Sequence, residues 1–222
     1  MTKHAKAAVF QKAYDLGFAY ERDYRGCAQC VIAALQDALE VRNPDTDAIF
    51  KSATGLAGGV AQETDGNCGA YAGGAMMIAY HVGRERDNFA DPEKIRLITS
   101  ALVSKLHKKF IEEYGTVTCG CIHTKIMGRP FYIKDPEELK KFDAAGAHTE
   151  KCTRVVALAS RWTAETAQGD DHPGDPGDGD GCRQAVRRTA LDVGGSVGRP
   201  RLPRACARGT AVGAADLLLD RG

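Results

Sequence analysis

Long apolar segments are missing from this sequence, and so is any excess of charge of one sign. No stretch approaches the roughly 20 apolar residues of a membrane span, and no apolar secretion signal follows Met1. The 30 basic and 29 acidic side chains leave a formal net charge of +1. This balance gives no electrostatic basis for binding nucleic acid or an anionic membrane. We therefore expect a cytoplasmic protein that binds neither.

Motifs for several common chemistries are also missing. The sequence contains no phosphate-binding loop, no dinucleotide-binding fingerprint and no constellation for a hydrolytic nucleophile. What it does contain is eight cysteines. A chain of this length buries a core without disulfides, and cytoplasmic thiols stay reduced. The cysteines are therefore better explained as metal ligands, redox groups or buried small side chains than as a disulfide framework.

The composition changes abruptly after Trp162. Lysine, isoleucine, methionine and all aromatic residues disappear from residues 163–222, and Gly, Asp, Arg and Pro replace them. Such a segment buries too little apolar surface to offset the entropy lost on ordering. We predict a helical cysteine-motif domain over residues 1–162 and a low-complexity, disordered tail over residues 163–222. Two origins of the tail stay open, a shifted reading frame and an ordinary disordered extension.

Apolar residues of the first part recur every three or four positions, which is typical of helices. The pattern predicts an all-α fold, a single helical bundle. The paired glycines Gly73 and Gly74 would let another backbone approach closely. Thr116 to Met127 is ambiguous, because its cysteines and His123 alternate as in a short strand. The expected helices are a first one of about five turns whose apolar stripe covers residues 10–18, further ones over residues 27–39, 46–56, 70–81 and 91–115, a short one from 135 and a last one after 149.

Three cysteines stand at the expected beginnings of helices, namely Cys27, Cys68 and Cys152. Backbone N–H groups and the partial positive charge of a helix N-terminus stabilise a thiolate, the form that attacks disulfides and binds metals. Each of the three also lies on an inward-facing stripe, so each alone is equally explained as a small buried side chain. Three equivalent positions on separate helices favour a shared chemical role.

Two pairs of nearby cysteines add further candidates. Cys27 and Cys30 form a Cys-x-x-Cys that places both sulfurs on one helix face, which makes them the candidate catalytic dithiol. No βαβ pattern of a thioredoxin domain surrounds them, and the long gap to Cys68 argues against a zinc finger. Cys119 and Cys121 could supply metal ligands from one extended segment, and we expect the nearby His123 to be an exposed loop residue. His148 could polarise Cys152.

These motifs together resemble the C-GCAxxG-C-C family, whose members are expected to be redox-active. The resemblance is carried by the run from Gly26 to Gln29, by Gly58-Gly59, by the run from Cys68 to Gly73, by that from Gly115 to Cys119, and by Cys152. It covers residues 8–162 and implies no established substrate or reaction. By position, the four cysteines of the family fall on Cys27, Cys68, Cys119 and Cys152. This chain departs from the pattern in the additional thiols Cys30 and Cys121.

Three hypotheses follow. The first is an iron–sulfur or other thiolate-bound metal centre for electron transfer, with Cys27, Cys68, Cys119, Cys152 and Cys121 as candidate ligands. The second is a thiol–disulfide redox protein. The third is a non-catalytic helical protein whose cysteines only pack. The sequence identifies neither the redox partner nor the oligomeric state, and a homo-oligomer is compatible with the Gly-rich helix.

Overall fold

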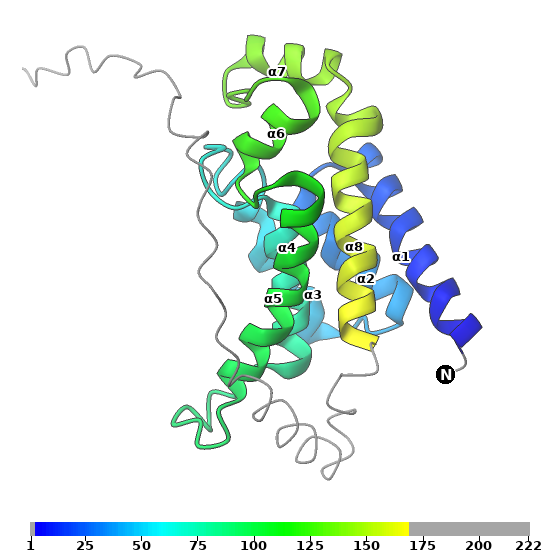
Figure 1. Ribbon diagram of the computed structural model, residues 1–222, viewed down its shortest axis with the longest axis vertical. Coiled ribbons are helices and arrows are strands. Elements are labelled where there is room, and N and C mark those ends of the chain that lie inside the picture. Colours follow the sequence, from blue (N-terminus) through cyan, green and yellow to red (C-terminus); the bar gives the residue numbers. More distant parts are fainter. Residues whose placement is uncertain (1–2, 169–222) are drawn as a thin grey trace, which may run out of the picture.

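The computed structural model describes residues 3–168, and this part of the chain is all-α, as the periodicity predicts (Figure 1). It forms a bundle without strands among these residues, joined by one isolated antiparallel bridge between Asn67 and Thr118. The elements are α1 (Lys3–Asp23), α2 (Cys27–Leu39), α3 (Pro44–Ser52), the 3-10 turn η1 (Ala53–Leu56), α4 (Gly69–Val82), α5 (Ile95–Tyr114), α6 (Cys119–Met127), α7 (Pro136–Ala144), the π-helical turn η2 (Ala147–Lys151) and α8 (Cys152–Gln168).

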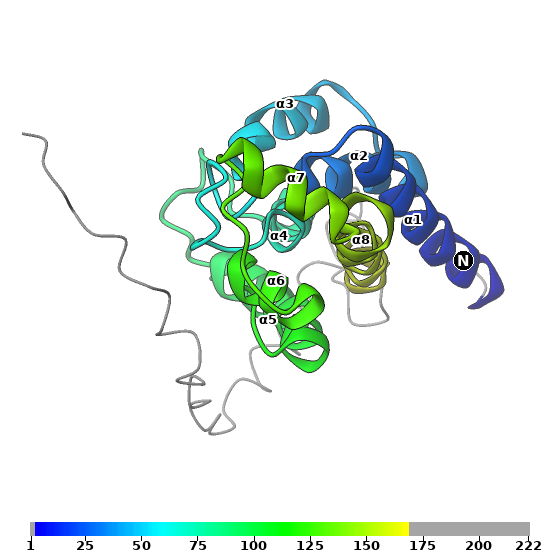
Figure 2. The same cartoon turned by 90° about the horizontal axis from the view of Figure 1, so that it is seen from above.

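Helix α8 lies at the centre and packs against α1, α2, α4 and α5 (Figures 1 and 2). Small residues bring these helices close together. A Cβ on Gly73 of α4 would lie 2.5 Å from the carbonyl oxygen of Ala28 on α2, and a Cβ on Gly17 of α1 would lie 2.5 Å from Ser160 Oγ on α8. The prediction that the paired glycines admit another backbone is thus confirmed at Gly73, because only a residue without Cβ fits there.

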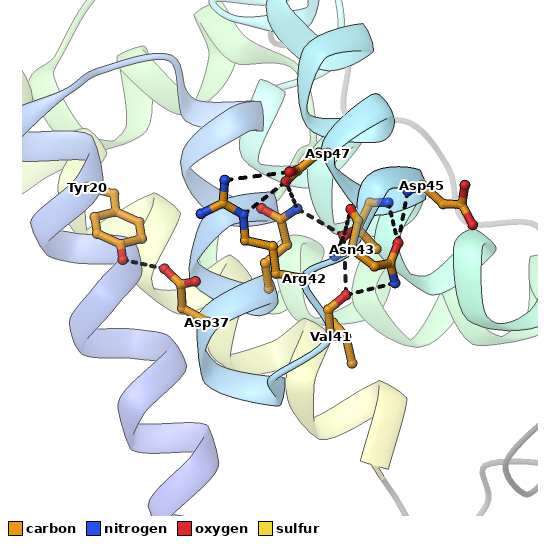
Figure 3. Close-up of polar contacts among 9 residues, drawn as sticks. Tyr20, Asp37, Val41, Arg42, Asn43, Asp45 and Asp47 are labelled. Atoms are coloured by element: carbon orange, nitrogen blue, oxygen red, sulfur yellow. Dashed lines mark hydrogen bonds and ion pairs between the residues drawn. The ribbon is translucent and has the colours of Figure 1, made fainter.

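The corner between α2 and α3 is fixed by polar contacts (Figure 3). The Asn43 side chain accepts hydrogen bonds from the backbone N–H groups of Asp45 and Thr46, and the Thr46 hydroxyl accepts one from the Asn43 N–H in return. This capping box satisfies the free donors at the start of α3. Tyr20 on α1 donates to Asp37 on α2 at 2.6 Å, which ties the first two helices together.

The helix boundaries differ from the prediction most clearly at α5 and α8. Helix α5 begins at Ile95 rather than at Asp91, and the Asp91 carboxylate instead accepts hydrogen bonds from the N–H groups of Ile95 and Arg96. Helix α8 continues through Trp162 to Gln168, where Thr163 and Ala164 are still buried. The remainder of the predicted tail, residues 169–222, lies outside the described residues. Within residues 3–168, no helix combines the length and the apolar character of a membrane span.

The segment with α6 and α7 forms a separate cap on the bundle. Figures 1 and 2 place both helices at the end of the molecule where α8 begins. Phe131, Phe142 and Ala147 of this segment form a small apolar cluster of their own, whereas Ile122 of α6 belongs to the main core. Asp135 caps α7 by accepting from the N–H groups of Glu137 and Glu138. The cap thus encloses the space between itself and the bundle.

Candidate functional site

Four cysteines lie at helix beginnings, and all four line one cavity. Cys27, Cys119 and Cys152 are the first residues of α2, α6 and α8, and Cys68 is the residue that precedes α4. Their side chains border a partly enclosed cavity of about 200 Å³ beneath the cap. The structure therefore brings together residues that are up to 125 positions apart in the chain, namely Cys27 and Cys152.

The segment around Cys119 is a helix and not the short strand that its alternating pattern suggested. Helix α6 begins at Cys119, so its thiol occupies the same position as that of Cys27. Cys152 differs, because it follows directly on η2 and its N–H already donates to the Ala147 carbonyl. A pattern of alternating residues this short does not distinguish a strand from the first turn of a helix. In this segment, strand-like hydrogen bonding is confined to the bridge between Asn67 and Thr118.

Backbone hydrogen bonds between two loops place Cys68 beside Cys119. The Cys68 N–H donates to the Val117 carbonyl at 2.7 Å, and the Cys119 N–H donates to the Gly66 carbonyl at 2.9 Å. These reciprocal bonds hold the beginnings of α4 and α6 together. Cys68 and Cys119 belong to these two paired segments, so their side chains lie close together although they are distant in the sequence.

The loop before Cys68 contains a left-handed turn. Residues 58–62 all have positive φ, and they include Val60 at 66°, a conformation that β-branched residues avoid. A backbone hydrogen bond from Gly58 reaches Cys27. Such conformations cost of order 1–2 kcal/mol per residue and are concentrated at functional sites. The strained turn thus directs a backbone donor at a cavity sulfur.

Cys27 and Cys68 are neighbours in the cavity wall. Of the groups around Cys27, the Cys68 thiol has the largest effect in raising its pKa. The sulfur of Cys27 rests on Gly69, since a Cβ at that glycine would lie only 2.5 Å from Cys27 Sγ. Glycine directly after Cys68 therefore makes room for the sulfur of the other cysteine. The structure describes both as free thiols.

Burial has a larger effect on the pKa values of these thiols than their positions at helix N-termini. The Cys68 thiol, burial and the charge of Glu21 raise the pKa of Cys27 well above its ordinary value, although the Gly58 hydrogen bond acts in the opposite direction. Burial raises the pKa of Cys119 to about 12, and burial together with Glu21 raises that of Cys152 as well. The expectation of stabilised thiolates is wrong for the free protein, because several potential anions share one poorly solvated space.

Glu21 is a cavity residue that sequence reasoning missed. It lies in the last turn of α1, is only 4% exposed and lines the cavity, and its Oε2 has no hydrogen-bond partner. Burial raises its pKa to about 7, opposed by the nearby Cys30 thiol and by the charge of Arg25. A signal was present in the sequence: Ala13, Gly17 and Glu21 follow one another at intervals of four, so the inward stripe of α1 ends on a carboxylate.

His123 is buried rather than exposed as expected. It is 2% exposed, lines the cavity, and its Nε2 lies 3.5 Å from Cys119 Sγ. Burial lowers the pKa of His123 to about 4, so the ring is neutral near pH 7. The expectation for His123 was wrong because the segment is a helix and not extended. On helix α6, Cys119 and His123 are four positions apart and therefore face the same side. His148 also lines the cavity, beside Cys152, and its Nδ1 lies 2.5 Å from Asp143 Oδ1.

The two additional cysteines, Cys30 and Cys121, lie outside this cavity. Cys30 is buried one turn after Cys27, where its Sγ donates to the Arg25 carbonyl at 3.1 Å, and it borders a different surface pocket with Tyr20. Cys121 is half-buried on α6 and does not border the cavity. The geometry thus separates these two positions from the four that the family pattern selects, and their catalytic and metal-binding roles stay predictions.

The donor types in the cavity suit a metal, but their arrangement does not. Four cysteines, two histidines and a carboxylate border the same space. However, within residues 3–168 no three Cys, His, Asp or Glu side chains are grouped so that they could share one metal ion. Structural and redox metals take three or four protein ligands at fixed distances. The residues as arranged therefore do not fit a metal centre.

Comparisons with known proteins agree with the pattern of cysteines. A family model described as putative redox-active protein (C_GCAxxG_C_C) matches residues 26–166, which include all four cavity cysteines and the whole cap. No curated protein and no solved structure matches the chain. Because the family model spans well over half of the sequence, this chain belongs to the C_GCAxxG_C_C family of redox-active proteins.

Proposed function

We propose that this protein is a thiol–disulfide redox protein in which Cys27 and Cys68 interconvert between dithiol and disulfide. The observation that carries the proposal is the position of the Cys27 sulfur against Gly69, the residue directly after Cys68, in the wall of one cavity. Exchange needs only two thiols, one that attacks and one that resolves the mixed disulfide. Of the cavity cysteines, Cys68 has the largest effect on Cys27, and the family assignment supports a redox role.

Cys27 is the better nucleophile of the pair. The N–H of Gly58 donates to its sulfur and, taken alone, lowers its pKa, and the sulfur stands at the beginning of α2. A thiolate that forms there as the substrate sulfur approaches is stabilised by both features. Cys68 is in position to attack Cys27 in the second step. The Cys-x-x-Cys partner Cys30 is directed at the Arg25 carbonyl instead.

Peptide mapping after oxidation tests this proposal. We expect mild oxidation of the reduced protein to produce a Cys27–Cys68 disulfide, identified by mass spectrometry without reduction. Cys27→Ser and Cys68→Ser each abolish it, whereas the matched control Cys30→Ser keeps it. A Cys27–Cys30 disulfide instead of the Cys27–Cys68 disulfide would contradict this proposal and would identify the Cys-x-x-Cys pair as the reactive dithiol.

A thiolate-bound metal centre, such as an iron–sulfur cluster, is the second candidate function. One observation favours it: Cys27, Cys68, Cys119 and Cys152 come from four different helix beginnings and border a single cavity. Against it stands the arrangement of these side chains, which would have to rearrange to coordinate one ion. Anaerobic purification followed by iron and sulfide analysis and an optical spectrum separates the two candidates, since the dithiol protein is colourless.

A further inference from the structure

The size and the walls of the cavity restrict what reaches the Cys27–Cys68 pair. A cavity of about 150 Å³ holds a ligand the size of benzene. At about 200 Å³ this cavity therefore accommodates about eight non-hydrogen atoms, which is smaller than the usual sites for drug-sized ligands. A disulfide carried on a protein loop is many times larger and does not enter such a space.

The thiols lie below the surface of the bundle, which restricts the approach of a large substrate. Cys68 is 6% exposed, and Cys27 is half-buried. The cap covers them, with Leu139 and Phe142 of α7 among the cavity walls. The Asp143 carboxylate contacts His148 Nδ1 at 2.5 Å and Arg25 Nη2 at 3.4 Å, and so fastens the cap to the loop between α1 and α2. A disulfide sulfur has to approach Cys27 from within the cavity.

The lining also selects the polarity of the ligand. Ile122, Val155 and Val156 contribute apolar walls, where a charged group loses its hydration. The permanent cation of the lining, Arg25, is exposed and already pairs with Asp143. Two buried polar atoms in the same walls, Glu21 Oε2 and His123 Nδ1, have no hydrogen-bond partner. Unsatisfied polar atoms of this kind indicate a missing water or ligand group. An uncharged ligand with a hydroxyl group matches both features.

We infer that the substrate of this dithiol is a small, uncharged disulfide of about eight non-hydrogen atoms, and not a protein disulfide. The inference rests on the proposed function. In the reaction, the Cys27 thiol loses its proton and its sulfur attacks one substrate sulfur, so the substrate S–S bond breaks and one thiol leaves with a proton. Cys68 then attacks Cys27, the second thiol leaves with the Cys68 proton, and two electrons have passed to the substrate.

Single-turnover oxidation of the reduced protein by disulfides of different size tests this inference. Bis(2-hydroxyethyl) disulfide has the right size and polarity, glutathione disulfide is several times larger and charged, and insulin supplies a protein disulfide. Each rate is divided by the rate of the same disulfide with free dithiothreitol, which removes differences in intrinsic reactivity. Formation of the Cys27–Cys68 disulfide is followed by mass spectrometry.

We expect the normalised rate for bis(2-hydroxyethyl) disulfide to exceed the other two at least tenfold. Leu139→Ala, which widens the cavity without removing a thiol, should raise the rate for glutathione disulfide several-fold. Equal normalised rates for all three disulfides would overturn the inference and leave the proposed function in place. If none of them oxidises the pair while the unfolded chain reacts, the proposed function fails and the inference fails with it.

Discussion

The buried carboxyl group of Glu21 gives the most direct test of the site's electrostatics. Replacement by glutamine keeps the shape of the side chain and removes its charge at every pH. Glu21 is nearly inaccessible and its Oε2 has no partner, so the folded protein favours the protonated acid. The variant should therefore lack the loss of stability that the parent protein shows as the pH rises.

The magnitude follows from the pKa of Glu21. Burial raises it from 4.5 to about 7, and each pKa unit corresponds to about 1.4 kcal/mol. Because the folded-state pKa is the higher one, the contribution is fully present below pH 4.5 and is lost as the pH rises through about 7. Ionised Glu21 thus lowers the free energy of unfolding by roughly 3 kcal/mol above that range.

Urea unfolding of the reduced proteins at about pH 5 and about pH 8.5 measures this difference. We expect Glu21→Gln to be about as stable as the parent at the lower pH and more stable by up to roughly 3 kcal/mol at the higher pH. The exposed Glu112 on α5 supplies a matched control, and Glu112→Gln should show no such pH dependence. His123 titrates in both proteins, so its contribution cancels in the comparison.

One result would refute the reasoning. If the difference in unfolding free energy between parent and Glu21→Gln is the same at both pH values, Glu21 is ionised or solvated in the folded protein. The cavity would then not be the poorly solvated space that raises the thiol pKa values. A loss of stability at the higher pH would likewise indicate that the carboxylate has a partner that stabilises its charge.

Three further predictions concern the walls and thiols of the cavity. Gly69→Ala places a methyl group 2.5 Å from Cys27 Sγ, so the free energy of unfolding measured in urea should fall by about 1–3 kcal/mol. Gly55→Ala is the control and should be neutral, because a Cβ at Gly55 meets nothing within 4 Å. Because the pKa of Cys119 is raised to about 12, this thiol should react with iodoacetamide at about pH 8 roughly a thousandfold more slowly in the folded protein than in the unfolded chain. Mass spectrometry follows the reaction, and equal rates would show an accessible thiolate. Asp135→Ala removes the cap of α7 and should cost about 1 kcal/mol, measured by urea unfolding, with an unchanged midpoint speaking against a role of this cap.

The sequence alone determined the helical class and most helix beginnings, because these depend on local signals. The capping residues Asn43 and Asp135 precede proline at the first helical position, a combination that predicts a helix start without tertiary information. The regular stripe of α2 and the paired glycines of α4 likewise predicted which faces are inside. Cys27 stands at the beginning of α2 as predicted, whereas the helical backbone that leads into Cys152 already begins with η2 at Ala147.

Only the tertiary structure decided which side chains meet and how acidic they are. Cys68 and Cys119 lie close together because two loops pair through the Gly66 and Val117 carbonyls, a contact that no periodicity encodes. Glu21 joins the site because α1 packs antiparallel to α8. The thiol pKa values rise instead of falling because desolvation depends on everything that surrounds a group, whereas the helix N-terminus is a local and weaker influence.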